Sequence, residues 1–355
     1  MSSTDYTEDT LVEQPAIALF RQLQWETANC HGETFPNSFL GRETSTEVVL
    51  VARLRAALEK LNDGVPPDAI NAAIEELTRD RSTLTPAAAN RDVYQLLKNG
   101  VKVSVRGEDD QETTETVRVI DWDDDTNNDY ILAFQLWVTG EMYKRRTDLV
   151  GSVNGIPLVF IELKAAQKNV KDAFDDNLRD YKTTIPQLFW YNALIILSNG
   201  RDSRIGSITA EWEHFVEWKK IGSAEEQGAV SLETMLRGTC ERTRLLDIVE
   251  NYILYEEIKG GSRKLVARNH QYHGVNDAIA AVEQIGENRG RLGVFWHTQG
   301  SGKSYSIRTF ALQCHFEQFL REISTAITRF LTSFEMTSES RINDLFVAKG
   351  LAQTR

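Results

Sequence analysis

The sequence of 355 residues predicts an α/β fold, in which a mixed sheet is flanked by helices. Apolar residues first recur at helical spacing, over 8–25, 48–61, 67–79 and 86–98. From Val101 the pattern changes to alternating or β-branched runs typical of strands, at 102–105, 117–120, 131–138 and 148–153. A strand that is apolar on both faces then precedes a helix and a second buried strand, at 156–164, 170–182 and 193–198. Such a strand, helix and returning strand build an α/β sandwich.

The composition is that of an ordinary globular protein, with 41% hydrophobic and 26% charged residues. No run approaches the roughly 20 apolar residues needed to cross a membrane, and the polar N-terminus does not predict secretion. The cysteines, Cys30, Cys240 and Cys314, lack metal-binding spacing and suit a reducing cytoplasm. A net charge of −12 argues against nonspecific coating of nucleic acid, although the basic run 144–146 can still face phosphate.

The strand at 156–164 carries two charged residues at its end, Glu162 and Lys164. Because they are two apart, their side chains point to the same face. The turn signal Asn154-Gly155 predicts a hairpin with the preceding strand, which contains Asp148. A three-residue loop would place Asp148 opposite Glu162, whereas a two-residue loop would require a β-bulge.

These three residues have the chemistry of a metal-dependent phosphodiesterase. Two neighbouring carboxylates, Asp148 and Glu162, are stable as anions mainly when a cation such as Mg²⁺ lies between them. The metal would activate a water for in-line attack, and Lys164 would position that water or neutralise the transition state. The plainer alternative is a solvated strand end. On the next helix Asn177 and Tyr181 share a face, where they could position DNA or, for Tyr181, simply pack.

A glycine-rich segment, 297–304, follows an apolar strand at 291–296 and precedes a helical pattern. It is close to the phosphate-binding pattern GxxxxGK[ST], with candidate ATP-binding residues Gly300, Gly302, Lys303 and Ser304. The alternative is a chance turn rich in glycine and serine. No acidic DExx sequence follows Ser304, so we expect ATP binding without ATPase or translocase activity.

A loose polar stretch near 222–228 predicts a boundary between two domains. The first would span 1–225. The second, 226–307, begins with helical patterns at 232–255 and 275–284 around a basic stretch at 260–269. The tail, 308–355, has apolar residues at helical spacing and predicts an amphipathic helix.

Taken in order, these motifs resemble the N-terminal part of the R (restriction and motor) subunit of type I restriction–modification enzymes. The resemblance covers about residues 5–307 and rests on the motifs EDTLVE (8–13), RRTD (145–148), NGIPL (154–158), ELK (162–164), NLRDYK (177–182), SNG (198–200), ARNHQY (267–272) and WHTQGSGKS (296–304). The tail from 308 no longer resembles the motor, so the chain looks truncated.

The resemblance implies a restriction-endonuclease-like PD-(D/E)xK domain that cuts double-stranded DNA, followed by the start of a RecA-like motor. Asp148, Glu162 and Lys164 match the family's metal and catalytic residues, and Gln271 matches a position near the adenine of ATP. Companion methyltransferase (M) and specificity (S) subunits are the implied partners. Asn177 replaces the family's Gln, which puts its DNA-positioning role in doubt.

Three further residues bear on the assignment of the nuclease site. Thr147 stands in place of the Pro of the PD signature, which should matter little because the aspartate is the ligand. Glu8 or Glu13, on the first helix, could add a metal contact.

Two other hypotheses compete with the nuclease: a non-catalytic subunit that only docks on the methyltransferase and specificity core, and an unrelated P-loop NTPase with an accessory domain. The missing acidic box counts against the last.

Overall fold

The computed structural model describes residues 9–36, 38–106, 112–222, 226, 228–285, 287, 293 and 300–314. Contacts within the chain divide it between Val266 and Ala267, not at 225/226 as the polar stretch suggested. The segment after 228 belongs to the first unit because its backbone is bound there: Trp25 donates to the Cys240 carbonyl at 3.1 Å, and the Tyr94 hydroxyl donates to the Val249 carbonyl at 3.0 Å.

The predicted N-terminal helices are present, and proline helps to begin three of them. A π-helical turn (Asp9–Glu13) leads into α2 (Gln14–Gln22). It is followed by α3 (Val51–Leu61), α4 (Pro67–Thr78) and α5 (Pro86–Asn99). Proline lies at the first or second position of α2, α4 and α5, where its missing N–H leaves no helical bond unmade. Each helix buries one apolar face.

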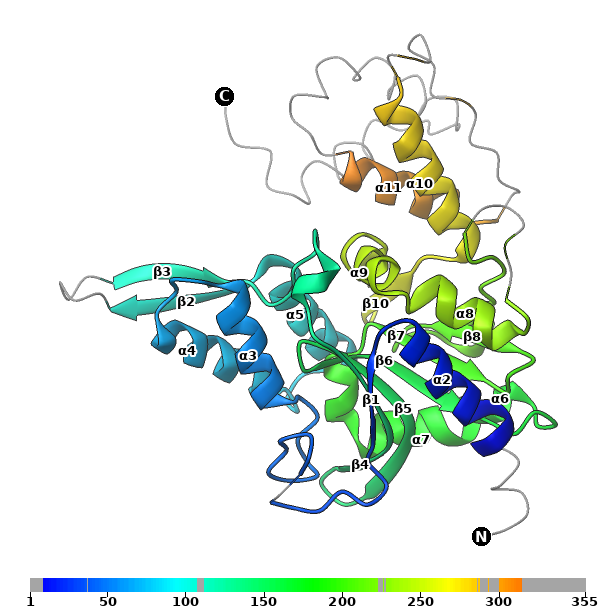
Figure 1. Cartoon of the computed structure of the whole chain (residues 1–355). Coiled ribbons are helices and arrows are strands. Elements are labelled where there is room, and N and C mark those ends of the chain that lie inside the picture. Colours follow the sequence, from blue (N-terminus) through cyan, green and yellow to red (C-terminus); the bar gives the residue numbers. More distant parts are fainter. Residues whose placement is uncertain are drawn as a thin grey trace. The chain divides into compact units, whose positions relative to one another are not determined.

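A six-stranded mixed sheet forms the core of the first unit, in the order β1-β4-β5-β6-β7-β8 (Figure 1). The predicted strands are β4 (Tyr130–Thr139), β5 (Lys144–Val153), β6 (Ile156–Leu163) and β7 (Leu194–Ser198). Two short edge strands, β1 (Glu26–Asn29) and β8 (Ser203–Gly206), were not predicted. β6 and β7 pair in parallel, as the intervening helical crossover requires.

Helical segments cover both faces of this sheet. On one face, the ring of Trp25 packs against Gly151 of β5, where a Cβ would lie 3.1 Å from the ring and 3.3 Å from Val159 of β6. On the other face, the ring of Phe160 packs against Tyr181 and Phe189. Tyr181 belongs to α7 (Arg179–Thr184), which continues from α6 (Val170–Asp172) through a π-helical turn (Ala173–Leu178). The strand β6 is therefore buried on both sides.

A second, two-stranded sheet pairs β2 (Val101–Arg106) with β3 (Glu112–Val117), and α4 packs on it (Figure 1). The prediction of a strand at 117–120 was wrong for every residue except the first, Val117. Asparagine side chains bind the backbone there instead of a neighbouring strand. Asn62 pairs with the N–H and C=O of Arg118 at 2.7 and 2.9 Å, and Asn154 donates to the Val119 carbonyl at 2.8 Å.

The single helix predicted at 232–255 is two helices and a strand: α8 (Ser231–Thr239), α9 (Arg242–Asn251) and β9 (Ile253–Ile258). Glu241 separates the helices, because its carboxylate accepts from the N–H groups of Thr243 and Arg244 and caps α9. The basic stretch that follows forms β10 (Gly261–Val266), which is antiparallel to β9.

The second unit contains α10 (Asn269–Glu283) and α11 (Lys303–Gln313). The predicted helix at 275–284 is thus confirmed and begins earlier than predicted. The strand predicted at 291–296 and the amphipathic helix predicted in the tail lie outside the described residues. In the part of the chain that the structure describes, no helix is long and apolar enough to span a membrane.

Candidate active site

A β-bulge in the β5–β6 hairpin determines which residues face each other. The hairpin has the two-residue loop, since Val153 pairs with Ile156 and Ser152 with Pro157. Asn154 and Gly155 have φ of 50° and 78°, as a type I′ turn requires.

The register then shifts by one residue, so that Gly151 pairs with Val159 and Leu158 is the extra residue. Leu149 pairs with Ile161 beyond the bulge. The next pair in this register is Asp148 and Glu162, which is the arrangement that the sequence required of a two-residue loop. Directly opposed side chains in such a pair have Cβ atoms about 5 Å apart.

The two carboxylates have different surroundings. Glu162 is 2% exposed, whereas Asp148 is half-buried. The Asp148 Oδ2 accepts the Leu163 N–H at 2.8 Å, which ties its side chain to the strand that carries Glu162. Asp148 can therefore face an incoming ligand while Glu162 forms the floor of the site.

Lys164 follows β6 and connects Glu162 to the next helix. Its Nζ lies 3.7 Å from Glu162 Oε1 and donates to Asn177 Oδ1 at 2.6 Å. The Lys164 backbone N–H donates to the Ser198 carbonyl at 2.8 Å, which continues the pairing with β7. The lysine is thus held from both ends beside the buried carboxylate.

Asn177 and Tyr181 share a helix face as predicted, and their side chains touch, with Asn177 Nδ2 3.4 Å from the Tyr181 hydroxyl. That hydroxyl donates to the Arg146 carbonyl at 3.0 Å. Burial, and then the negative charge of Glu162, raise the pKa of Tyr181 far above its usual range. Tyr181 is therefore a buried, protonated phenol directed at the backbone of β5, and Asn177 is the one of the pair that contacts Lys164.

The motif around Asp148 is supported on both sides. Thr147, in place of the family's Pro, is buried and its hydroxyl donates to the Leu136 carbonyl at 3.2 Å. Arg145 forms an ion pair with Asp180 at 2.5 Å. The hydrogen bond from Arg145 lowers the pKa of Asp180. Two motifs far apart in the sequence, 145–148 and 177–182, thus meet across β5 and α7.

Glu13 contacts a residue that sequence reasoning missed. Glu13 is 6% exposed, and its Oε2 accepts from Gln135 Nε2 at 2.6 Å. Phe134 pairs with Leu149 and Leu136 with Thr147, so Gln135 lies opposite Asp148 in β4, with a left-handed φ of 56°. A lone polar residue in the apolar run 131–138 was the signal that could have indicated it. Glu8 lies outside the described residues.

The donor set of this site fits Mg²⁺. Asp148 and Glu162 are two opposed carboxylates in the β5–β6 register, and among the described residues no group of three or more His, Cys, Asp or Glu side chains is placed to hold a metal ion. Mg²⁺ is bound in this way, through one or two carboxylates, with waters and substrate phosphates completing its shell. A carboxylate buried as deeply as Glu162 also needs a compensating positive charge, which Lys164 supplies in part.

In the second unit, the predicted ATP-binding residues lie at the start of α11, with Lys303 and Ser304 in its first turn. Gly300 and Gly302 have φ of 78° and 81°, which other residues rarely adopt. Gln271 on α10 touches this segment: its Nε2 donates to the carbonyls of Ser301 at 3.0 Å and Gly302 at 3.3 Å. A Cβ at residue 302 would lie 2.4 Å from that nitrogen. The turn preceding Gly300 lies outside the described residues.

Comparison with known proteins gives a consistent result. Residues 5–214 match the family described as the N terminus of type I restriction enzyme R proteins. Residues 270–325 match the SWI2/SNF2 ATPase family.

Among curated relatives, the chain is 33% identical to the type I restriction enzyme HindI endonuclease subunit of Haemophilus influenzae, over 84% of this chain and 29% of that protein. It is 27% identical to the putative type I restriction enzyme MjaIXP endonuclease subunit of Methanocaldococcus jannaschii, over 86% of this chain and 31% of that protein.

Both of these curated relatives are named as endonuclease subunits of type I restriction enzymes. The chain belongs to the type I restriction enzyme R protein family. It spans about three tenths of the length of the two curated relatives.

Proposed function

We propose that this chain carries the Mg²⁺-dependent site that cleaves double-stranded DNA in a type I restriction complex. One observation carries the proposal: the bulge in the β5–β6 hairpin turns Asp148 to the position opposite Glu162, beside Lys164. A one-residue slip would send Asp148 to the other face of the sheet. Bulges are common next to active sites, where they redirect a side chain, so a bulge at this point favours a functional reason for the register.

The residues of the site have distinct roles in this proposal. Asp148 and Glu162 would hold a Mg²⁺ ion, which when bound would supply Lewis-acid activation of the phosphodiester and of a water. Lys164 places its ammonium beside Glu162, where it neutralises charge that develops on the phosphate oxygens. Asn177 accepts from Lys164 and so orients the ammonium. Tyr181 keeps Asn177 and β5 together and takes no direct part in the chemistry.

A plasmid-nicking assay in Mg²⁺ tests the assignment. Asp148→Asn, Glu162→Gln and Lys164→Met keep the shape of each side chain and remove its charge, so we expect each to lower cleavage at least about 100-fold. Asp68→Asn is the control, because it removes an exposed carboxylate from α4, away from the site strands β5 and β6. Cleavage by the site variants at the wild-type rate would refute the catalytic assignment.

We also propose that the second unit binds ATP through Gly300, Gly302, Lys303 and Ser304, with Gln271 beside them. The match to an ATPase family over 270–325 supports this. An isotherm for a fluorescent ATP analogue that is unchanged by Lys303→Ala would contradict it.

The partners that we propose are double-stranded DNA and the methyltransferase and specificity subunits. Co-purification with those subunits tests the assembly. If the chain assembles with them and does not nick DNA in Mg²⁺, its role is docking alone, which is the second hypothesis drawn from the sequence.

A further inference from the structure

The β4–β5 hairpin presents two exposed cations on the strand that carries Asp148. Lys144 and Arg146 are both exposed. Within the described residues neither forms an ion pair, whereas Arg145 between them is neutralised by Asp180. The chain as a whole has a net charge of −12, so this pair of cations forms a local positive region on an acidic protein. They identify this hairpin as a local site for an anionic partner.

Both cations lie against one aromatic ring. The Lys144 Nζ is 5.0 Å from the centre of the Trp137 ring, and the Arg146 guanidinium carbon is 5.7 Å from it. Trp137 pairs with Arg146 across the hairpin, and Lys144 is its diagonal neighbour. The ring is half-buried, so the two cations are held in place and keep their charged ends at the surface.

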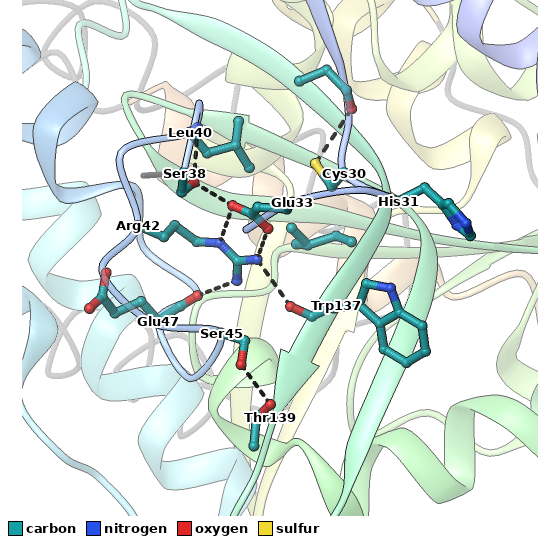
Figure 2. Close-up of polar contacts among 12 residues, drawn as sticks. Cys30, His31, Glu33, Ser38, Leu40, Arg42, Ser45, Glu47, Trp137 and Thr139 are labelled. Atoms are coloured by element: carbon teal, nitrogen blue, oxygen red, sulfur yellow. Dashed lines mark hydrogen bonds and ion pairs between the residues drawn. The ribbon is translucent and has the colours of Figure 1, made fainter. Parts of the chain in front are cut away.

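The strand beneath this ring is anchored by a buried ion pair. Arg42 is 1% exposed, pairs with Glu33, and donates to the carbonyl of Trp137 at 3.1 Å. Figure 2 shows the Trp137 side chain extending away from this ion pair. Further along β4, the Thr139 N–H donates to the Ser45 carbonyl at 2.9 Å. The hairpin is therefore tied to the loop before α3, and its cations are preorganised for binding.

The position of these cations relative to Asp148 matches a nucleic-acid backbone. Arg146 and Lys144 precede Asp148 by two and four residues, or about 7 and 14 Å along an extended strand. Successive phosphates of one DNA strand advance about 3.4 Å along the helix axis. Because the strand also winds around that axis, the direct distance between neighbouring phosphates is about twice this rise, so the two cations can meet phosphates about one and two nucleotides from one held at Asp148.

We propose that Lys144, Arg146 and Trp137 form a phosphate-binding track that holds the backbone of duplex DNA leading into the Asp148 site. The proposal rests on the proposed nuclease function for its substrate. The track contributes affinity and register on the duplex, and it does not read bases.

The test measures DNA binding without cleavage. The whole chain is titrated against a fluorescent duplex of about 30 base pairs in Ca²⁺, at salt concentrations from about 50 to about 200 mM. Lys144→Gln and Arg146→Gln should each reduce the slope of log K against log salt by about 0.9, which corresponds to about eightfold weaker binding at 0.1 M salt. Lys102→Gln is the matched control, because Lys102 is also an exposed lysine on a strand but lies in the β2–β3 sheet.

The outcomes separate this inference from the nuclease proposal. If the slopes are equal in wild type and both variants, the phosphate-binding track is refuted. The cations would then be assigned to binding an acidic protein surface. Failure of the wild-type chain to bind DNA would also refute the track. If Asp148-dependent nicking persists while the slopes do not change, only the track fails. If the slopes change and no nicking occurs, the nuclease proposal fails and the track remains.

Discussion

Lys264 on β10 is a buried lysine that binds two neutral oxygens. It is 2% exposed, and its Nζ donates to Asn90 Oδ1 at 3.0 Å and to the Asn192 carbonyl at 2.6 Å. Asn90 Oδ1 also accepts from the Tyr255 hydroxyl at 2.6 Å. Burial lowers the pKa of Lys264 to about 7. The unfolded chain would keep this lysine protonated up to a pKa of about 10.4. Between these values the unfolded state binds the extra proton.

The stability of the first unit should therefore depend on pH through this residue. Stability rises with pH wherever the unfolded state binds more protons, so the cost of charging Lys264 is present in full below pH 7 and falls as pH increases. With native and unfolded pKa values of about 7 and about 10.4, the free energy of unfolding gains about 2 kcal/mol between pH 6 and pH 8.5. This is an upper bound, because the bonds to Asn90 and Asn192 favour the charged form.

Urea unfolding followed by tryptophan fluorescence measures this gain. All tryptophans except Trp296 precede residue 267, so the signal reports mainly on the first unit. Lys264→Met keeps the volume of the side chain and should abolish the gain, while Lys102→Met, at an exposed site, should keep it. Parallel profiles for wild type and Lys264→Met between pH 6 and pH 8.5 would refute the reasoning.

Three further changes give direct tests of the site and the loop. Gly155→Ala should lower the free energy of unfolding by about 3 kcal/mol, because φ is 78° and the new Cβ would lie 2.5 Å from the Leu50 carbonyl oxygen; an unchanged thermal midpoint would contradict this. Asn177→Leu removes the acceptor of Lys164 and should slow cleavage about 10- to 100-fold with little loss of thermal stability; wild-type cleavage would show that the contact is incidental. Gln271→Ala removes the bonds that hold the Ser301 and Gly302 carbonyls and should weaken binding of a fluorescent ATP analogue about tenfold, equivalent to about 1.4 kcal/mol; equal affinity would exclude a role in shaping the loop.

The strands that carry the candidate site could be predicted because their signals are local. Asn154-Gly155 specifies the turn, and the apolar run that ends at Glu162 has the length and composition of a buried strand. The sequence also required a bulge if the loop had two residues, and the structure has both. Which residue would be extra could not be predicted, because it depends on a distant segment: the Leu158 carbonyl accepts the Ala193 N–H at 2.7 Å, from the residues before β7.

The missed elements depend on contacts between distant residues. β1 has no apolar alternation and exists because residues 131–134 of β4 pair with it. After the break at Thr239, helix α9 is capped by Glu241. Glutamate seldom begins helices, so little in the sequence indicated this break. Val119 and Ile120 are β-branched and buried, yet their segment is bound by the side chains of Asn62 and Asn154. Tertiary hydrogen bonds of this kind override local preference.

The bulge at Leu158 makes the hairpin obey a parity rule. If the number of residues between Asp148 and Glu162 changes by an odd number, the side chains of one strand move to the opposite face of the sheet. An even change keeps each side chain on its own face. A loop lengthened by one residue would therefore bring the two acids together only if the bulge were lost at the same time. Relatives with longer or shorter hairpins should vary in steps of two residues, or should exchange a bulge for a loop residue. Anyone grafting this hairpin into another protein must count residues in the same way.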